Sequence, residues 1–359
     1  MSLYQSALEN IGQILLTGLE GTELSEESSA FLSQARVGGV LLFTKNYTDP
    51  EQLQNLINEI QKCRPETPFW IAADQEGGRV QRFKAPFSIV PPALTLAKKD
   101  SPKLVYSVSE VIAKELKAVG VNLNFAPVAD IWTNPENKVI GDRAFGTDET
   151  SVTKFVTPFL RGHLLHRVQA CVKHFPGHGD TTEDSHFHLP KIARSAADLR
   201  DRELRPFLKA FRSHCGMVMT AHIINSHMDP DYPATLSSKT LFEFLRKELR
   251  YSRVIVSDDL EMQAITDHFG IEDAPVLALN ASCDLLIYRT EKAARIAYEA
   301  LVRAIENGAL RPERVLEAVK RSQDLKRDTF DSYKPGDPED LKLLGCPEHQ
   351  AVLEEFRQS

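Results

Sequence analysis

The 359-residue sequence predicts an α/β protein that folds as a single (β/α)8 barrel of the TIM type. Short apolar runs alternate with longer amphipathic stretches, and there are eight such runs. Strands that alternate with helices imply a parallel sheet, and eight of them close such a sheet into a barrel of about 250 residues or more. The alternative is an open doubly wound sheet, but no G-x-G-x-x-G signature follows any of the runs.

The eight predicted strands are short and almost continuously apolar, which is typical of parallel strands buried on both faces. In chain order they are residues 13–17, 39–43, 69–73, 121–125, 170–174, 217–222, 254–257 and 283–288.

The stretches between these strands carry apolar residues at helical spacing. Asp49 followed by Pro50 is a typical helix start, and Ser25 is a candidate cap for an earlier helix. The predicted helices are residues 25–35, 49–62, 101–118, 150–165, 197–213, 239–249 and 291–307. We expect residues 1–325 to form the barrel. Residues 326–359, rich in charge, Pro and Gly, would form a tail packed on it, with a last helix near 349–356.

Composition disfavours several classes of protein. The net charge of -7 argues against a general nucleic-acid binder, which normally presents a basic face. We find no signal peptide and no window of about 18 uncharged apolar residues, so we expect no membrane span. The five cysteines are scattered without C-x-x-C spacing, as in reduced cytoplasmic proteins. We therefore expect a cytoplasmic protein; its oligomeric state stays open, with a monomer favoured.

Five predicted strands end in polar residues, at 74–79, 124–130, 173–180, 220–222 and 257–259. The carboxyl ends of barrel strands meet at one mouth, where active sites of this fold lie. Ionisable residues at five such ends therefore predict one shared site.

The densest polar stretch, residues 173–190, contains four histidines and three carboxylates, and it has three interpretations. A metal site would use these residue types, but no H-E-x-x-H or other metal spacing is present. A solvated loop is the second interpretation. The third is acid–base chemistry: Asp184 lies two residues before His186, and a carboxylate partner fixes the tautomer and raises the pKa of an imidazole.

A second candidate for chemistry is the acidic pair that follows the buried run 254–256. Asp258, held at a strand end, suits a nucleophile. Asp259 is adjacent, and we expect it to cap a helix starting at Leu260. Spacing alone does not choose between the two carboxylates.

Specific motifs occur at residues 74–82 (DQEGGRVQR), 124–130 (NFAPVAD), 141–146 (GDRAFG), 173–180 (KHFPGHGD), 184–186 (DSH) and 257–260 (SDDL). With these motifs the chain resembles glycoside hydrolase family 3, and within it the bacterial β-N-acetylglucosaminidases of peptidoglycan recycling. The resemblance covers residues 8–320. Larger members carry a second sandwich domain, for which the tail here is too short.

The resemblance implies a retaining exo-glycosidase that removes terminal β-linked N-acetylglucosamine from muropeptide-type saccharides, with no metal and no cofactor. Asp258 would be the nucleophile that forms a covalent glycosyl-enzyme, and His186 with Asp184 the acid/base dyad, on a loop expected to cover the sugar. The implied sugar-binding residues are Asp74, Arg82, Arg143, Lys173 and His174. A phosphorylase, a β-glucosidase, a metal-dependent hydrolase and an inactive sugar-binding module remain alternatives.

Overall fold

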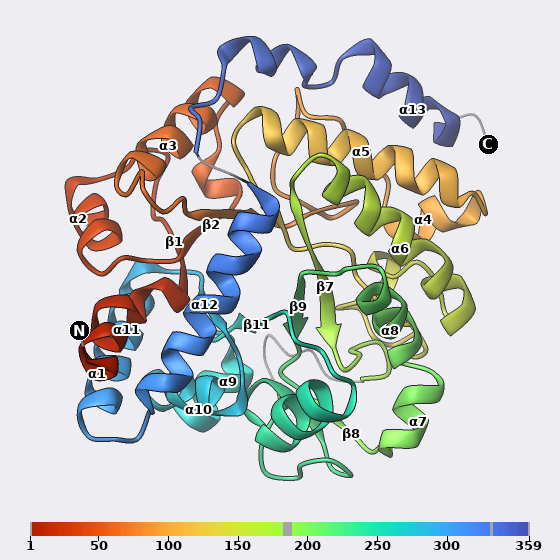
Figure 1. Ribbon diagram of the computed structural model, residues 1–359. Coiled ribbons are helices and arrows are strands. Elements are labelled where there is room, and N and C mark those ends of the chain that lie inside the picture. Colours follow the sequence, from red (N-terminus) through yellow and green to blue (C-terminus); the bar gives the residue numbers. More distant parts are fainter. Residues whose placement is uncertain (1, 182–188, 331–332, 358–359) are drawn as a thin grey trace.

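The computed structural model describes residues 2–181, 189–330 and 333–357. Within them, eight parallel strands close into a barrel in the order β1-β12-β11-β9-β7-β6-β3-β2 (Figure 1). The strands are β1 Leu15–Gly18, β2 Gly39–Leu42, β3 Trp70–Ala73, β6 Leu123–Asn124, β7 Gln169–Phe175, β9 Met217–Thr220, β11 Val254–Asp259 and β12 Leu285–Tyr288. Each coincides with a predicted run, so the predicted barrel is confirmed.

Helices surround the barrel on its outer face (Figure 1). They are α1 Leu3–Asn10, α2 Glu26–Gln34, α3 Pro50–Lys62, α4 Ala93–Lys98, α5 Pro102–Ala118, α6 Glu149–Leu165, α7 Ala196–Asp201, α8 Leu204–Arg212, α9 Gln263–Phe269, α10 Asp273–Ala281, α11 Glu291–Glu306, α12 Pro312–Thr329 and α13 Pro347–Arg357. Short 3-10 segments are η1 Ile11–Ile14, η2 Thr44–Asn46, η3 Gly141–Arg143, η4 Ala234–Leu236 and η6 Pro338–Leu343, and η5 Lys239–Glu248 is a π-helix. The predicted caps are present, since Asp49 and Ser25 accept hydrogen bonds from the backbone N–H groups of the first turns.

Two small sheets lie outside the barrel. One pairs β4 Gln75–Gly77 with β5 Val80–Gln81 in an antiparallel hairpin directly after β3, and the other pairs β8 Lys191–Ile192 with β10 Ile224–Asn225. The hairpin returns the chain toward the end of β3. Arg82, the residue after β5, therefore lies beside Asp74, the residue after β3.

Three helix predictions need correction. The prediction of a single helix over 197–213 is wrong, because α7 ends at Asp201 and a separate helix, α8, begins at Leu204. Leu199 and Leu204 are both fully buried but five positions apart, which one continuous helix would turn to different faces. The segment 239–249 winds as a π-helix, with the Leu249 N–H donating to the carbonyl of Phe244. No helix starts at Leu260, since α9 begins only at Gln263.

The amino-terminal end of the barrel is closed by α12, which lies across the centre of the ring in Figure 1. Its Lys326 donates to the carbonyls of Gly38 and Pro68 at the start of β2 and β3, and Phe330 packs edge-on against Trp70. The interior of the barrel is filled by apolar side chains, joined at its amino-terminal end by Leu325 of α12. The barrel residues are Leu16, Leu41, Trp70, Ala72, Leu123, Phe125, Cys171, Met217, Met219, Val254, Val256, Leu285 and Ile287. The barrel is therefore a packed core that is open only at its carboxyl end.

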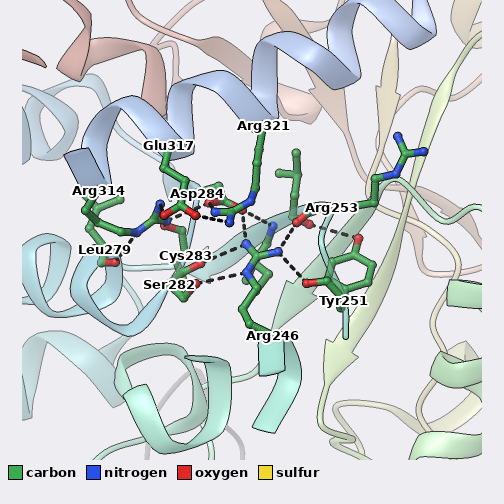
Figure 2. Close-up of polar contacts among 12 residues, drawn as sticks. Arg246, Tyr251, Arg253, Leu279, Ser282, Cys283, Asp284, Arg314, Glu317 and Arg321 are labelled. Carbon is green, nitrogen blue, oxygen red and sulfur yellow. Dashed lines mark hydrogen bonds and ion pairs between the residues drawn. The ribbon is translucent and has the colours of Figure 1, made fainter. Parts of the chain in front are cut away.

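A buried carboxylate joins α12 to the start of β12. Asp284 is fully buried and accepts from Arg246, from Arg314 at 2.8 Å and from Arg321 at 3.0 Å, and also from the backbone N–H of Ile255 (Figure 2). Burial would raise the pKa of Asp284, but the three guanidinium groups hold it below its usual range.

The tail beyond α12 crosses the outside of the barrel to α13, which lies beside α5 (Figure 1). There the buried carboxylate of Glu115 accepts from the Gly345 backbone and from His349 Nδ1 at 2.9 Å.

Candidate active site

Strand alternation brings three ionisable side chains into the barrel mouth. Successive side chains of a strand point to opposite faces, so residues two positions beyond an inward side chain also point inward. Asp74 lies two positions after the inward Ala72. In the same way, Lys173 lies two positions after Cys171, and Asp258 two positions after Val256. These three ionisable side chains lie at the carboxyl ends of β3, β7 and β11.

The three side chains line one cavity of about 560 Å³ at the barrel mouth. Its described lining consists of Leu41, Phe43, Asp74, Arg79, Val80, Arg82, Phe125, Lys138, Val139, Arg143, Lys173, His174, His178, Met219, Asp258, Asp259, Met262, Ile287 and Arg289. Of the predicted site residues, the structure thus brings together Asp74, Arg82, Arg143, Lys173, His174 and Asp258. The residues His186 and Asp184 lie outside the described part of the chain.

One wall of the cavity is a connected set of charges. Asp74 accepts from Lys173 Nζ at 2.8 Å through Oδ1 and from Arg82 Nη2 at 2.9 Å through Oδ2. Arg143 holds Glu76 with two parallel hydrogen bonds of 2.9 and 2.8 Å, and Lys173 Nζ lies 2.6 Å from Glu76 Oε1. Bidentate, charge-assisted pairs of this kind fix the orientation of both side chains.

Electrostatics keep this set ionised. Burial alone would raise the pKa of the Asp74 carboxyl, but Lys173 and Arg82 hold it well below its usual range. Arg143 and Lys173 outweigh burial at Glu76 and lower its pKa to about 2. The same carboxylates raise the pKa of Lys173 above its ordinary value, although burial opposes this. Three cations thus face two anions in fixed positions, which suits recognition of a polar ligand.

Glu76 is a residue that the sequence-based prediction missed. It does not line the cavity but supports Arg143 and Lys173 from behind. The motif 74–82 contained it, and β4 carries it two residues beyond Asp74. Nothing in the spacing indicated that its partners would be Arg143, 67 positions away in the chain, and Lys173 of β7.

A buried carboxylate also orients the histidine at the end of β7. Asp130 accepts from His174 Nδ1 at 2.7 Å and from the backbone N–H groups of His174 and His178. Because a carboxylate only accepts, His174 carries its hydrogen on Nδ1, which leaves Nε2 for other partners. Burial lowers the pKa of His178 to about 4, so its imidazole is neutral at physiological pH.

The adjacent acids Asp258 and Asp259 have different environments. The Asp258 Oδ1 accepts from the Asp259 N–H at 2.8 Å. Burial opposes ionisation of Asp258, but the nearby His222 and His174 hold its pKa below the ordinary value. Asp259 is paired with Arg289 at 2.9 Å and accepts from the Glu261 N–H, while burial raises its pKa to about 7. Asp259 therefore does not cap a helix. The pKa of Asp258 lies below its ordinary value while that of Asp259 is raised, so Asp258 is the more fully ionised of the two acids at neutral pH.

Among the described residues, no group of three or more His, Cys, Asp or Glu side chains is arranged to hold a metal ion. No helix in the described ranges is long and apolar enough to span a membrane.

A family profile and a curated relative both match most of this chain. The profile described as "Glycosyl hydrolase family 3 N terminal domain" matches residues 7–325. A β-hexosaminidase of Idiomarina loihiensis is 38% identical over 288 residues, which are 79% of this chain and 85% of the relative.

Two solved structures with related sequences superpose on nearly the whole of this chain. A family 3 β-N-acetylglucosaminidase from Paenibacillus superposes with a TM-score of 0.89 at 35% identity, over 97% of this chain and 67% of the other. NagZ from Neisseria gonorrhoeae, solved with N-trifluoroacetyl-D-glucosamine, superposes with a TM-score of 0.80 at 28% identity, over 96% and 97% of the two chains.

Proposed function

This chain belongs to glycosyl hydrolase family 3, and we propose that it is a retaining β-N-acetylhexosaminidase that removes terminal β-linked N-acetylglucosamine from muropeptide-type saccharides. The proposal rests above all on one observation. An anionic carboxylate, Asp258, shares a closed-bottomed cavity with the fixed charges of Asp74, Arg143 and Lys173. We place this activity in the barrel formed by residues 1–325 and assign it to a cytoplasmic enzyme that needs no cofactor.

The shape of the cavity supports cleavage from a chain end. Ligand sites commonly measure about 300–1,000 Å³, and a cavity of about 560 Å³ is of a size for a sugar with part of its neighbour. Inward side chains fill the barrel beneath it, so a saccharide enters end-on and stops. The non-reducing sugar would lie deepest, with its hydroxyl groups toward Asp74, Arg82, Arg143, Lys173 and His174.

The chemistry proceeds in two steps. In the first, an oxygen of Asp258 attacks the anomeric carbon while the bond to the glycosidic oxygen breaks, and His186 donates a proton to that oxygen. In the second, His186, paired with Asp184, removes a proton from water, whose oxygen attacks the anomeric carbon and releases Asp258. His186 acts as the imidazolium in the first step and as the neutral imidazole in the second, so neither form places a second anion beside the nucleophile, as an ionised carboxylate would.

The names of the relatives support the substrate class. The relatives named above act, by their names, on β-linked hexosamines or N-acetylglucosaminides, and the Neisseria structure contains an N-acylated glucosamine. The finer assignment to muropeptides rests on the motif resemblance.

Turnover of nitrophenyl N-acetyl-β-glucosaminide, compared with nitrophenyl β-glucoside, tests the proposal. We expect activity on the first compound, unchanged in phosphate-free buffer, and little on the second. Activity that requires phosphate would instead indicate a phosphorylase. Release of N-acetylglucosamine from N-acetylglucosaminyl-anhydro-N-acetylmuramic acid, absent in Asp258→Asn, tests the muropeptide assignment and the nucleophile together.

A further inference from the structure

A buried polar chain lies behind the proposed nucleophile. His222 follows β9, is fully buried, and is not among the described residues that line the cavity. Its Nε2 lies 3.0 Å from the Asp259 carbonyl oxygen, and its Nδ1 lies 2.8 Å from Thr235 Oγ1. Any effect of His222 on a sugar in the cavity must therefore pass through another residue.

The backbone of Asp259 connects His222 to Asp258. The carbonyl of Asp259 faces His222, and its N–H donates to Asp258 Oδ1 at 2.8 Å. The register of β11 against β12 shifts between Val256 and Asp259, so this segment departs from regular strand pairing. A side-chain donor on the carbonyl supplies a contact that holds the segment in place.

Hydrogen-bond chemistry fixes one proton of His222. A carbonyl oxygen only accepts, so Nε2 carries a hydrogen and donates to Asp259. The Thr235 hydroxyl has one hydrogen and lies 3.1 Å from the Ala221 carbonyl and 2.8 Å from Thr220 Oγ1. If Thr235 donates to the Ala221 carbonyl or to Thr220 Oγ1, Nδ1 donates to Thr235 and the ring is charged. If Thr235 donates to Nδ1, the ring is neutral. The contact with Asp259 is kept in both states.

We propose that His222 is a positioning residue for the nucleophile: its Nε2–H holds the Asp259 backbone, whose N–H in turn orients the Asp258 carboxylate. This inference rests on the proposed role of Asp258. The charged form of His222 also stabilises the anion, since it is the first of the groups that lower the pKa of Asp258 against burial. Among the described residues, the other titratable groups that interact with Asp258 are His174, Lys173, His178, Asp259 and Cys171.

Two substitutions separate the donor from the charge. His222→Gln keeps an amide donor for the Asp259 carbonyl but carries no charge, and His222→Phe keeps a ring and removes both. We expect His222→Phe to lower kcat about 10- to 100-fold with little change in KM, because the nucleophile is misplaced while sugar contacts remain. His222→Gln should recover most of kcat. In both variants the acid limb of the kcat/KM profile should move to higher pH, because the Asp258 anion has lost a neighbouring cation.

His227, which is exposed, provides the matched control, since His227→Phe should change none of these values. Unchanged kcat in His222→Phe, or equal losses in Phe and Gln variants with an unmoved acid limb, would overturn the inference. If His222→Phe does not fold, His222→Leu, which also lacks the donor, takes its place, and a kcat equal to that of His222→Gln refutes the inference. Full activity of Asp258→Asn would overturn the proposed function instead, whereas an inactive Asp258→Asn beside an unaffected His222→Phe overturns this inference alone.

Discussion

Glu76 joins two cationic side chains at the cavity wall, and Glu76→Gln tests how much that junction stabilises the fold. The ordinary pKa of this carboxyl is 4.5, and Arg143 and Lys173 lower it to about 2 in the folded protein against the effect of burial. The two values differ by about 2.5, and each unit corresponds to about 1.4 kcal/mol, so ionised Glu76 contributes about 3 kcal/mol at neutral pH. Because the folded pKa is the lower one, this contribution is present above pH 4.5 and is lost as the pH falls toward 2.

Urea unfolding of the wild type and Glu76→Gln measures the difference. We expect about 3 kcal/mol lower stability for the variant at pH 7, narrowing to less than half of this at about pH 3. Glu59→Gln is the matched control: Glu59 pairs with Lys62 on the surface and is 57% exposed, so its loss should cost at most about 0.5 kcal/mol. A difference for Glu76→Gln below about 1 kcal/mol at pH 7, or one that is equal at both pH values, would refute the electrostatic argument.

Three other substitutions address the site and the opposite end of the barrel. Asp258→Asn should lower kcat by about 1,000-fold or more without loss of folding, measured by single-turnover kinetics and circular dichroism; retained activity would exclude Asp258 as the nucleophile. Asp130→Asn should lower kcat/KM about 10- to 100-fold, because His174 loses the partner that fixes its tautomer, and an unchanged value would contradict that role. Asp284→Asn should destabilise the protein by about 3–5 kcal/mol in urea unfolding, because three guanidinium groups lose their shared carboxylate. Its KM should stay unchanged, and a changed KM would show that the two ends of the barrel are coupled.

The barrel was predictable because its strands are marked by composition. Eight short apolar runs define parallel strands buried on both faces, and each predicted run contains the observed strand or overlaps it. The break between α7 and α8 was not predicted, although the five-residue spacing of Leu199 and Leu204 contained the signal. The π-helical winding of η5 has no comparable mark, because its buried positions fit an ordinary helix equally well.

The candidate site was predictable as a set of strand ends but not as a network. Alternation counted from Val254 and Val256 brings Asp258 into the barrel mouth, but the register shift between Val256 and Asp259 brings Asp259 to the same cavity, so alternation alone does not choose between the two acids. The partnership of Glu76 with Arg143, and of Asp130 with His174, joins distant positions in the chain. Such contacts follow from loop paths across the barrel mouth, which no local pattern encodes.

Position relative to the cavity separates two charge clusters that are chemically alike. At the amino-terminal end, the buried Asp284 is shared by Arg246 of η5 and by Arg314 and Arg321 of α12, and two of those arginines also donate to backbone carbonyls (Figure 2). At the carboxyl end, Asp74 and Arg82 lie in an equally linked set that faces an open cavity. Burying a charge is costly unless its partners are supplied, and at Asp284 the protein itself supplies three guanidinium groups and a backbone N–H. The cluster at the mouth can exchange part of its solvation for the hydroxyl groups of a sugar, and for this reason we assign recognition to it and stability to the other.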